Sequence, residues 1–184
     1  GIRAETYYQD LTGIPVETSP SSFSLTNAGS GFARVFPDTL ENTGTGYNYG
    51  LEITIQRYFN KNWHALFTGC LYNSRYTPSD GIERNTSFNG IYAANFLAGR
   101  EFKIKNNTLG LGVKVTGAGG KRKGVVDHVA SEQQGEVIFK DDGFNEDQFR
   151  DYFRFDIKTT YKINKEKMMH EIGIDLVNII GYDS

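Results

Sequence analysis

Hydrophobic and polar residues alternate one for one along most of this chain. In the segment 49–56 the odd-numbered residues are Tyr, Leu and Ile, whereas the even-numbered residues are Gly, Glu, Thr and Gln. Successive side chains of a β-strand point to opposite faces, so this pattern predicts a strand with one apolar and one polar face. It predicts seven strands in all, at about 2–9, 49–56, 63–76, 91–104, 108–116, 153–163 and 171–176. In the strands at 63–76 and 91–104 the alternation is less regular, so the sequence does not decide which of their side chains lie on the apolar face.

The connections between these strands fall into two length classes. Three are short and polar, at 60–62, 105–107 and 164–167, as is typical of hairpin turns. The others, at about 11–46, 77–90 and 117–151, are long and rich in Gly, Ser, Asn, Asp and Pro. Successive connections of an antiparallel meander alternate between the two ends of the sheet. The sequence therefore predicts an all-β, antiparallel up-and-down meander with its short turns at one end and its long loops at the other.

This arrangement is typical of outer-membrane β-barrels, which have short periplasmic turns and long extracellular loops. The longer predicted strands, of 11 to 14 residues, also suit a tilted membrane crossing. A self-contained small β-barrel or β-sandwich that binds a ligand or partner through its long loops shows the same alternation. That alternative stays open, and in it residues 22–26 would supply an eighth strand.

Composition and charge exclude several other classes. Hydrophobic residues make up 38% of the 184-residue chain and aromatic residues 14%, which argues against intrinsic disorder. A net charge of −2 gives no basic surface for nucleic acid, so no nucleic-acid partner is expected. No apolar run approaches the ~18 residues of a membrane helix, which excludes a helical membrane protein. The mean hydropathy of −0.47 is compatible with a membrane β-barrel, because the apolar and polar residues of alternating strands average to a polar value. The single cysteine, Cys70, excludes an intrachain disulfide.

Several segments, in order, resemble one family. Residues 41–59 read ENTGTGYNYGLEITIQRYF and contain the pattern N-x-G-x-G-x-N-Y-G-x-E-x-T-x-x-R. Further segments are YNSRY at 72–76, DGIERNT at 80–86, NFLAGREF at 95–102, YFRFD at 152–156 and DLVN at 175–178. Together these resemble the late barrel strands of TonB-dependent outer-membrane receptors of the Bacteroidetes type. The segments follow one another in the order and spacing of that family, and the resemblance covers nearly the whole chain.

The resemblance implies that residues 1–184 are a C-terminal segment of a transmembrane β-barrel. Such receptors have about 22 strands around an N-terminal plug, so plug and final strand are expected to lie outside this chain. The start of the chain also lacks the basic and apolar regions of a signal peptide, as expected of an internal piece. Seven strands cannot close an even-numbered bacterial barrel, so the first and last strands are expected to be open, association-prone edges.

The resemblance also implies a function. The chain would supply wall and extracellular loops of a transporter in the bacterial outer membrane that imports an unknown ligand. Its partners would be outer-membrane lipid, the rest of the barrel and the plug, the energy-coupling TonB complex through the N-terminal part, and a surface lipoprotein. No enzymatic activity and no cofactor are expected.

The alternation also gives candidate site residues. Polar side chains on the inner faces are expected to line the barrel lumen, where bonds to the plug or to each other are favoured over substrate contact. Aromatic residues near strand ends are expected to form the interfacial girdles, namely Tyr58, Phe59, Trp63, Tyr72, Tyr76, Tyr92 and Phe102. The lumen-facing candidates are Glu5, Glu52, Gln56, Lys114, Arg154, Asp156, Lys158 and Asp175.

Two loop motifs match known ligand sites only in part. The run GAGGKRKG at 117–124 lacks the first glycine and the Ser or Thr of a phosphate-binding loop, so Lys121 and Arg122 are read as loop residues, like Asp80 and Arg84. The acidic run at 141–147 lacks calcium-loop spacing, and no metal is predicted. The three histidines have no partner at metal spacing, and no catalytic motif appears. Weak metal candidates are Asp141, Asp142, Asn145 and Asp147.

Overall fold

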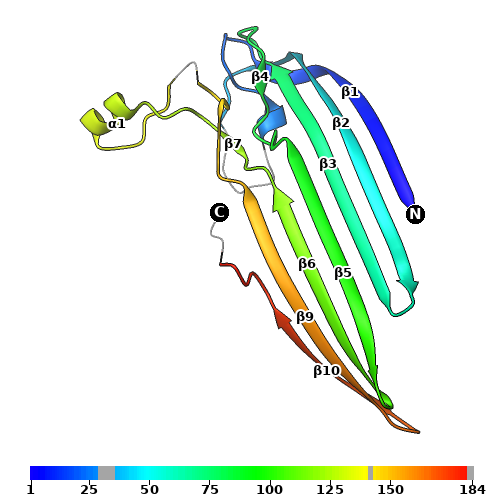
Figure 1. Cartoon of the computed structure of the whole chain (residues 1–184). Coiled ribbons are helices and arrows are strands. Elements are labelled where there is room, and N and C mark those ends of the chain that lie inside the picture. Colours follow the sequence, from blue (N-terminus) through cyan, green and yellow to red (C-terminus); the bar gives the residue numbers. More distant parts are fainter. Residues whose placement is uncertain (29–35, 141–142, 182–184) are drawn as a thin grey trace.

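Seven long strands form one antiparallel sheet in the computed structural model, which describes residues 1–28, 36–140 and 143–181 (Figure 1). Each long strand pairs with the next along the chain, so the sheet is an up-and-down meander and the predicted all-β fold class is confirmed. The strands are β1 (Ile2–Glu17), β2 (Leu40–Asn60), β3 (Trp63–Thr77), β5 (Tyr92–Ile104), β6 (Asn107–Ala118), β9 (Tyr152–Asn164) and β10 (Met169–Leu176).

Short elements occur in the loops. β4 (Arg84–Asn85) pairs with β3, and β7 (Arg122–Lys123) pairs with β8 (Asp147–Gln148). The helix α1 (His128–Gln134) begins after Asp127, whose carboxylate accepts the N–H groups of Val129 and Ala130. The 3₁₀ helix η1 (Leu25–Asn27) replaces the strand expected at residues 22–26, because the Ser24 hydroxyl caps that turn. None of the helices in the described part of the chain is long and apolar enough to cross a membrane.

Turns and loops segregate as the sequence predicts. In Figure 1 the connections β2–β3, β5–β6 and β9–β10 lie at one end of the sheet, and the long loops, η1 and α1 lie at the other. In the β2–β3 turn, Lys61 and Asn62 both have left-handed backbones, with φ of 51° and 67°, as a type I′ hairpin turn requires. The loop expected at 11–46 is shorter, since β1 continues to Glu17 and β2 begins at Leu40.

The strand register gathers the apolar residues on one face. Residues opposite each other in neighbouring strands share a face. Ile55 lies opposite Phe67, Phe67 opposite Phe96, Phe96 opposite Val115, and Val115 opposite Phe155. This row crosses five strands, and the register thereby settles the facing of the two strands that alternation left open. Their contribution to the apolar face is Ala65, Phe67, Leu71, Tyr92, Ala94, Phe96, Ala98 and Phe102.

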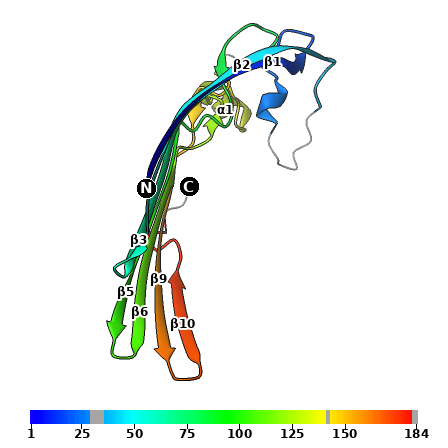
Figure 2. The same cartoon turned by 90° about the vertical axis from the view of Figure 1, so that its right-hand side faces the viewer.

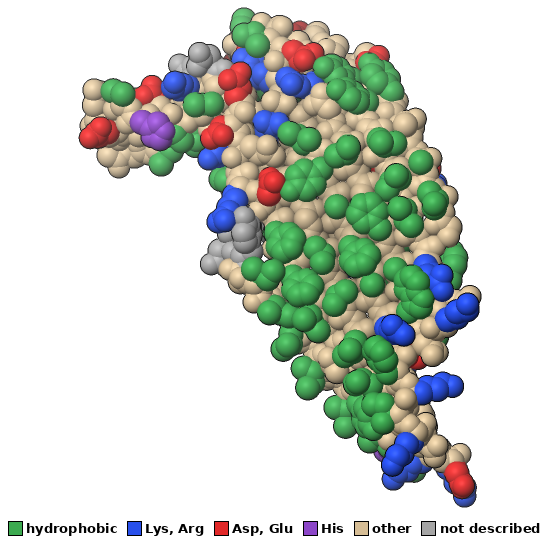
Figure 3. Space-filling view, in the orientation of Figure 1, with side chains coloured by type: hydrophobic (Ala, Val, Ile, Leu, Met, Phe, Trp, Pro, Cys, Tyr) green, Lys and Arg blue, Asp and Glu red, His purple; other side chains and the backbone are tan. Residues whose placement is uncertain are grey.

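The sheet is curved, and its two faces differ in shape as well as in chemistry. Figure 2 shows the sheet edge-on, with the loops folded toward its concave side. Figure 3, in the orientation of Figure 1, shows hydrophobic side chains spread over the convex face. The sheet does not close: in the described part of the chain, β1 pairs only with β2 and β10 only with β9. The convex face is therefore apolar, the concave face is polar, and both edges are open.

The small hydrophobic core lies at the loop end, on the concave side. Among the described residues, only Ile14, Val16 and Tyr76 are buried hydrophobic residues. Gly13 has φ of 69° and marks a register shift in β1, a β-bulge that turns Ile14 and Val16 toward the concave side, above Gly44. The rest of the sheet contributes no buried hydrophobic side chain, so it has no second layer packed on it.

Candidate functional site

The eight polar residues predicted to face a lumen all lie on the concave face. Glu5 lies opposite Glu52 in the β1–β2 ladder, and Lys114 lies opposite Asp156 in the β6–β9 ladder. Alternation and register place the other members on the same face, because they are an even number of residues away or directly opposite one of these. The set is Glu5, Glu52, Gln56, Lys114, Arg154, Asp156, Lys158 and Asp175.

Several of these concave charges bind each other. The Arg154 guanidinium lies 2.8 Å from Asp156, which also accepts the backbone N–H of Asn178 at 2.9 Å. Lys158 lies 3.5 Å from Asp175, on the neighbouring strand. Glu101 and Lys162, which the sequence did not single out, form a further pair at 2.9 Å. Glu5 is paired with Arg3 on its own strand, at 2.6 Å. Internal pairing therefore accounts for five of the eight candidates without a ligand.

A groove of about 470 Å³ runs along the concave face over β5, β6, β9 and β10. Its floor is formed by Gly99, Gly110 and Gly112, where the missing side chains expose the backbone of the sheet. The charged side chains of Glu101, Lys158 and their neighbours border it. The arrangement offers a shallow trough with a mostly apolar lining and charged side chains at its border. Among the described residues, no group of His, Cys, Asp or Glu side chains there is arranged to hold a metal ion.

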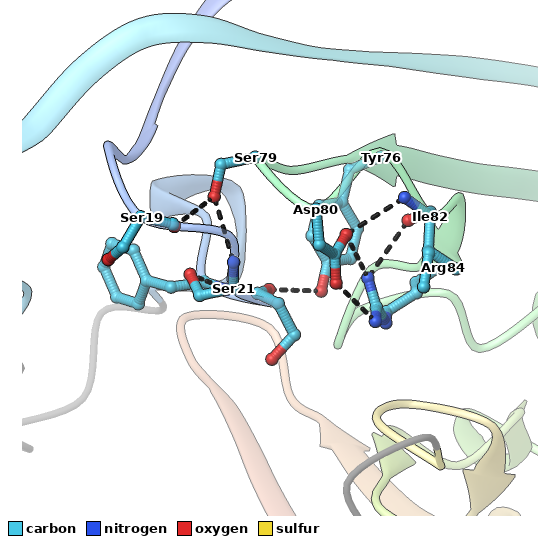
Figure 4. A network of polar contacts seen from close by, with 9 residues as sticks. Ser19, Ser21, Tyr76, Ser79, Asp80, Ile82 and Arg84 are labelled. Carbon is cyan, nitrogen blue, oxygen red and sulfur yellow. Dashed lines mark hydrogen bonds and ion pairs between the residues drawn. The ribbon is translucent and has the colours of Figure 1, made fainter.

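The loops are tied together at the end of the sheet above this groove. Figure 4 shows the contact between the loop after β1 and the loop after β3. The Tyr76 hydroxyl donates to the Ser22 carbonyl at 2.9 Å, and the Ser79 hydroxyl donates to the Ser19 carbonyl at 2.7 Å. The Ser79 hydroxyl also accepts the backbone N–H of Ser21 at 3.1 Å. We call the joined loops at 18–28, 78–91, 119–140 and 143–151 the loop platform.

Asp80 and Arg84, which the sequence predicts as loop residues, form an internal ion pair. Two guanidinium nitrogens of Arg84 donate to the two carboxylate oxygens of Asp80, at 2.9 and 2.7 Å (Figure 4). Arg84 is 8% exposed, and Asp80 also accepts the N–H of Ile82. Hydrogen bonding to Arg84 lowers the pKa of Asp80 below its usual value, and the same bond raises the pKa of Arg84. The pair is therefore part of the structure of the platform.

A second group of polar side chains joins the loops after β3 and β6. The Asn145 amide donates to the Asn85 carbonyl at 2.9 Å, and the Asn85 amide donates to the Asn145 carbonyl at 3.3 Å. Asn89 is 1% exposed and donates to the side-chain oxygens of Asn73 and Asn85. Sequence reasoning missed this group, because Asn85 and Asn145 are 60 residues apart and no local pattern marks them as partners.

The weak metal candidates do not form a site in the described residues. Asn145 is buried in the amide group described above, whereas Asp147 is exposed and lies 3.2 Å from Lys123. The Gln148 N–H and Lys123 lower the pKa of Asp147. Asp141 and Asp142 lie outside the described residues. In the rest of the chain, no group of three or more His, Cys, Asp or Glu side chains is arranged to hold a metal ion.

Lys121 and Arg122 have different environments although they are adjacent. Lys121 is exposed, and its amine lies 5.9 Å from the centre of the Phe88 ring. Arg122 donates to the carbonyls of Asn89, at 3.0 Å, and Glu146, at 3.3 Å. Of these two loop candidates, Lys121 is therefore the one whose charged group points outward.

The aromatic residues predicted to form girdles do not all lie on the same face of the sheet. Trp63 and Phe102 lie on the convex face near the turns, and Tyr92 lies on it near the loops. Tyr72 and Tyr76 instead point to the concave side, where their hydroxyls bind loop carbonyls. Phe59 also leaves the convex face. A register shift between Arg57 and Asn60 turns it toward His64, with the ring centres 6.2 Å apart.

Comparisons of the chain with models of protein families, with curated proteins and with solved structures found no match. The resemblance to TonB-dependent receptors therefore rests on the sequence segments quoted above.

Proposed function

We propose that this chain forms part of the wall of an outer-membrane β-barrel of the TonB-dependent receptor type, and that its long loops help to capture a ligand for import. The observation that carries the proposal is the exposed apolar convex face, opposite a polar concave face. Lipid would cover the convex face, the rest of the barrel would continue both edges, and the plug would face the concave side. The TonB complex and a surface lipoprotein are the further partners in this proposal.

The convex face is too apolar for contact with water. Soluble monomers rarely expose a contiguous apolar patch of more than roughly a few hundred Å². Here the exposed apolar residues of the convex face extend over six of the seven long strands, all except β9, and the described part of the chain provides no layer that covers them. The exposed members are Ile2, Tyr8, Tyr49, Leu51, Ile55, Trp63, Leu71, Phe96, Phe102, Ile104, Leu111, Ile172, Ile174 and Leu176.

The height of the apolar band fits a bilayer. On β5, Tyr92 and Phe102 are convex-face aromatics ten residues apart, and Ala94, Phe96 and Ala98 lie between them. Ten residues of strand extend ~33 Å. At the ~40° tilt of outer-membrane barrel strands this corresponds to about 25 Å, the usual height of the apolar band between the aromatic girdles.

The strand directions also fit a segment of a larger barrel. With seven strands in an antiparallel meander, β1 and β10 run in the same direction. Joining these two edges to each other would create a parallel pair, which bacterial single-chain outer-membrane barrels do not contain. An odd number of further strands between them gives an even, wholly antiparallel barrel, in which neither edge is left open.

The proposal is tested by asking which face meets lipid. In a Cys70→Ser background, Phe96→Cys places a thiol on the convex face and Leu97→Cys places one on the concave face, at the same level of β5. Each full-length variant is labelled with a small fluorophore and reconstituted in vesicles. We expect nitroxide lipids to quench the label at 96 strongly and the label at 97 weakly, with the reverse for aqueous iodide.

A second measurement addresses the location and the loops. An epitope inserted after Gln134, at the end of α1, should be detected on intact cells that make the whole receptor, and the protein should fractionate with the outer membrane. Deletion of the gene should abolish growth on one ligand of a panel of iron chelates, glycans, peptides and vitamins. Equal access of iodide to both labelled positions, with no quenching by lipid, would instead favour the self-contained binding module.

A further inference from the structure

A cluster of two arginines and two aromatic rings lies on the convex face at the turn end of the sheet. The Arg57 guanidinium stacks over the Trp63 ring, 4.0 Å from its centre. Arg100 lies directly opposite Trp63 in the β3–β5 ladder, and its guanidinium lies 5.1 Å from the centre of the Phe102 ring. Trp63 therefore lies between two guanidinium groups, and we call these four residues the arginine–aromatic cluster.

Neither arginine is neutralised within the described part of the chain. None of the ion pairs there includes Arg57 or Arg100, and neither side chain makes a hydrogen bond. Stacking on a ring occupies the face of a guanidinium and leaves its N–H edge free, which is the edge that binds a phosphate in bidentate fashion. The cluster thus presents guanidinium N–H groups that are free to donate hydrogen bonds to a phosphate.

The cluster belongs to a strongly basic end of the molecule. The segments that contain the three short turns, at 56–64, 100–108 and 162–171, carry eight Lys and Arg against three Asp and Glu. The rest of the chain carries twelve Lys and Arg against nineteen Asp and Glu. Figure 3 shows several basic side chains beside the apolar convex surface near this end. An anionic partner is therefore favoured at the turn end and disfavoured elsewhere.

A shallow hollow adjoins the cluster on the same face. It has a volume of about 570 Å³. Its polar border is formed by Lys61, Trp63, His64 and Arg100, and its apolar border by Ala98, Gly99, Leu111 and Val113. Ala98 and Val113 lie opposite each other in the β5–β6 ladder, and their small side chains leave the hollow between larger neighbouring side chains. A site with guanidinium groups at one side and small apolar residues at the other matches a molecule with an anionic head and a hydrocarbon chain.

We propose that the arginine–aromatic cluster binds the phosphate of an anionic phospholipid headgroup, and that an acyl chain of the same lipid lies in the adjoining hollow. This inference rests on the proposed function, which places the convex face in lipid and the turn end at the periplasmic leaflet. Aromatic rings and arginines with long apolar stems concentrate at this depth in membrane proteins. Two such arginines select anionic lipid over zwitterionic lipid through their charge.

Trp63 makes the site directly observable, because it is the single tryptophan of the chain. The full chain is reconstituted in phosphatidylcholine vesicles in which a small, equal fraction of lipid is either brominated phosphatidylglycerol or brominated phosphatidylcholine. Bromine on the upper acyl chain quenches nearby tryptophan fluorescence. We expect phosphatidylglycerol to quench Trp63 more strongly, and the preference to fall about fivefold for each arginine replaced in Arg57→Gln and Arg100→Gln.

The matched control is the double variant Lys103→Gln/Lys105→Gln, which removes the same charge from the same end. Lys103 lies on the concave face and Lys105 in a turn, so the preference should persist. An equal loss in this control would overturn the proposal in favour of diffuse attraction. Equal quenching by the two brominated lipids would also overturn it, and suppression by millimolar inorganic phosphate would assign the site to the free ion.

Failure of this inference is distinguishable from failure of the proposed function. The labelled Phe96→Cys variant reports whether the convex face is in lipid at all. Strong lipid quenching at position 96 without any headgroup preference at Trp63 contradicts only the phosphate site. Absence of lipid quenching at both positions contradicts the proposed function as well.

Discussion

At the scale of single residues, the loop platform is held by polar side chains. The buried or nearly buried members include Arg84, Thr86, Asn89 and Asn145, each with a hydrogen-bonded partner from another part of the loops or from β3. Such groups are costly to leave unpaired once they are buried. The stability of the platform therefore depends on individual polar contacts.

Replacement of Asp80 tests the buried ion pair between Asp80 and Arg84. Asp80→Asn leaves the Arg84 charge without its carboxylate, and we expect the local opening free energy of the loop at 78–91 to fall by ~2–3 kcal/mol. Amide hydrogen exchange in that loop measures the change. Asp147→Asn removes a carboxylate from an exposed pair and should have little effect. Equal effects of the two variants would contradict the structural role of Asp80.

The same ion pair predicts a pH dependence. Because the pKa of Asp80 is lowered in the folded loop, its contribution is fully present above the ordinary carboxyl pKa of about 3.9 and is lost as the pH falls through the lowered value. Exchange protection of residues 78–91 should be constant from neutral pH down to about pH 5 and should decline below about pH 4. The Asp80→Asn variant should lack this acid-induced decline.

At the scale of elements, a β-bulge redirects the end of β1. Alternation alone would place Ile14 and Val16 on the convex face with Ile2, but the extra residue at Gly13 turns both inward. There they contact Gly44 and form, with Tyr76, the only buried hydrophobic cluster of the described residues. The bulge thus joins the end of the strand to the loops.

A methyl group at Gly44 would disturb this junction. Its Cβ would lie 2.5 Å from Val16 Cγ1 and 2.9 Å from the Ile14 carbonyl oxygen. We expect Gly44→Ala to destabilise the loop end by ~1–3 kcal/mol, measured as earlier thermal unfolding and faster proteolysis of the loops. Gly112→Ala is the control, because its nearest contact would be an ordinary 3.7 Å to Lys158 Cβ. A larger loss for Gly112→Ala would contradict the packing described here.

At the scale of the whole molecule, the sheet is an open, curved wall with two different faces. A soluble domain of this length normally buries its apolar side chains between two layers. This sheet instead leaves its convex residues exposed and collects its buried residues at the loop end. Its stability outside lipid is therefore expected to be low, and its open edges favour association.

An added charge is expected to be much more costly on the convex face than on the concave face. Phe96 and Leu97 are neighbours on β5 with exposed fractions of 40% and 38%, but they point to the convex and concave faces. We expect Phe96→Arg to reduce the free energy of folding into lipid vesicles by ~2–4 kcal/mol, and Leu97→Arg to change it by much less. Urea titration of the chain folded in vesicles measures both. Equal losses would show that the convex face is not the lipid face.

Most of the sheet could be predicted from the sequence, because a period-two pattern is a local signal. The seven long strands and the end at which each connection lies agree with the structure, and the eight concave candidates share one face. The predictions that failed concern bulges and loops. Phe59 was expected on a girdle of the convex face, but a register shift moved it to the other side, and the 3₁₀ helix η1 occurs where a strand at 22–26 was considered.

The sequence by itself determined which residues form strands and which of them share a face, since both follow from neighbours one or two positions away. Only the tertiary structure decided that the apolar face is convex, that Gly13 redirects β1, and that Asn85 meets Asn145. It also brought Arg57 and Arg100, from different strands, to either side of Trp63. These relations depend on the twist and register of strands far apart in the chain, which leave no periodic trace in the sequence.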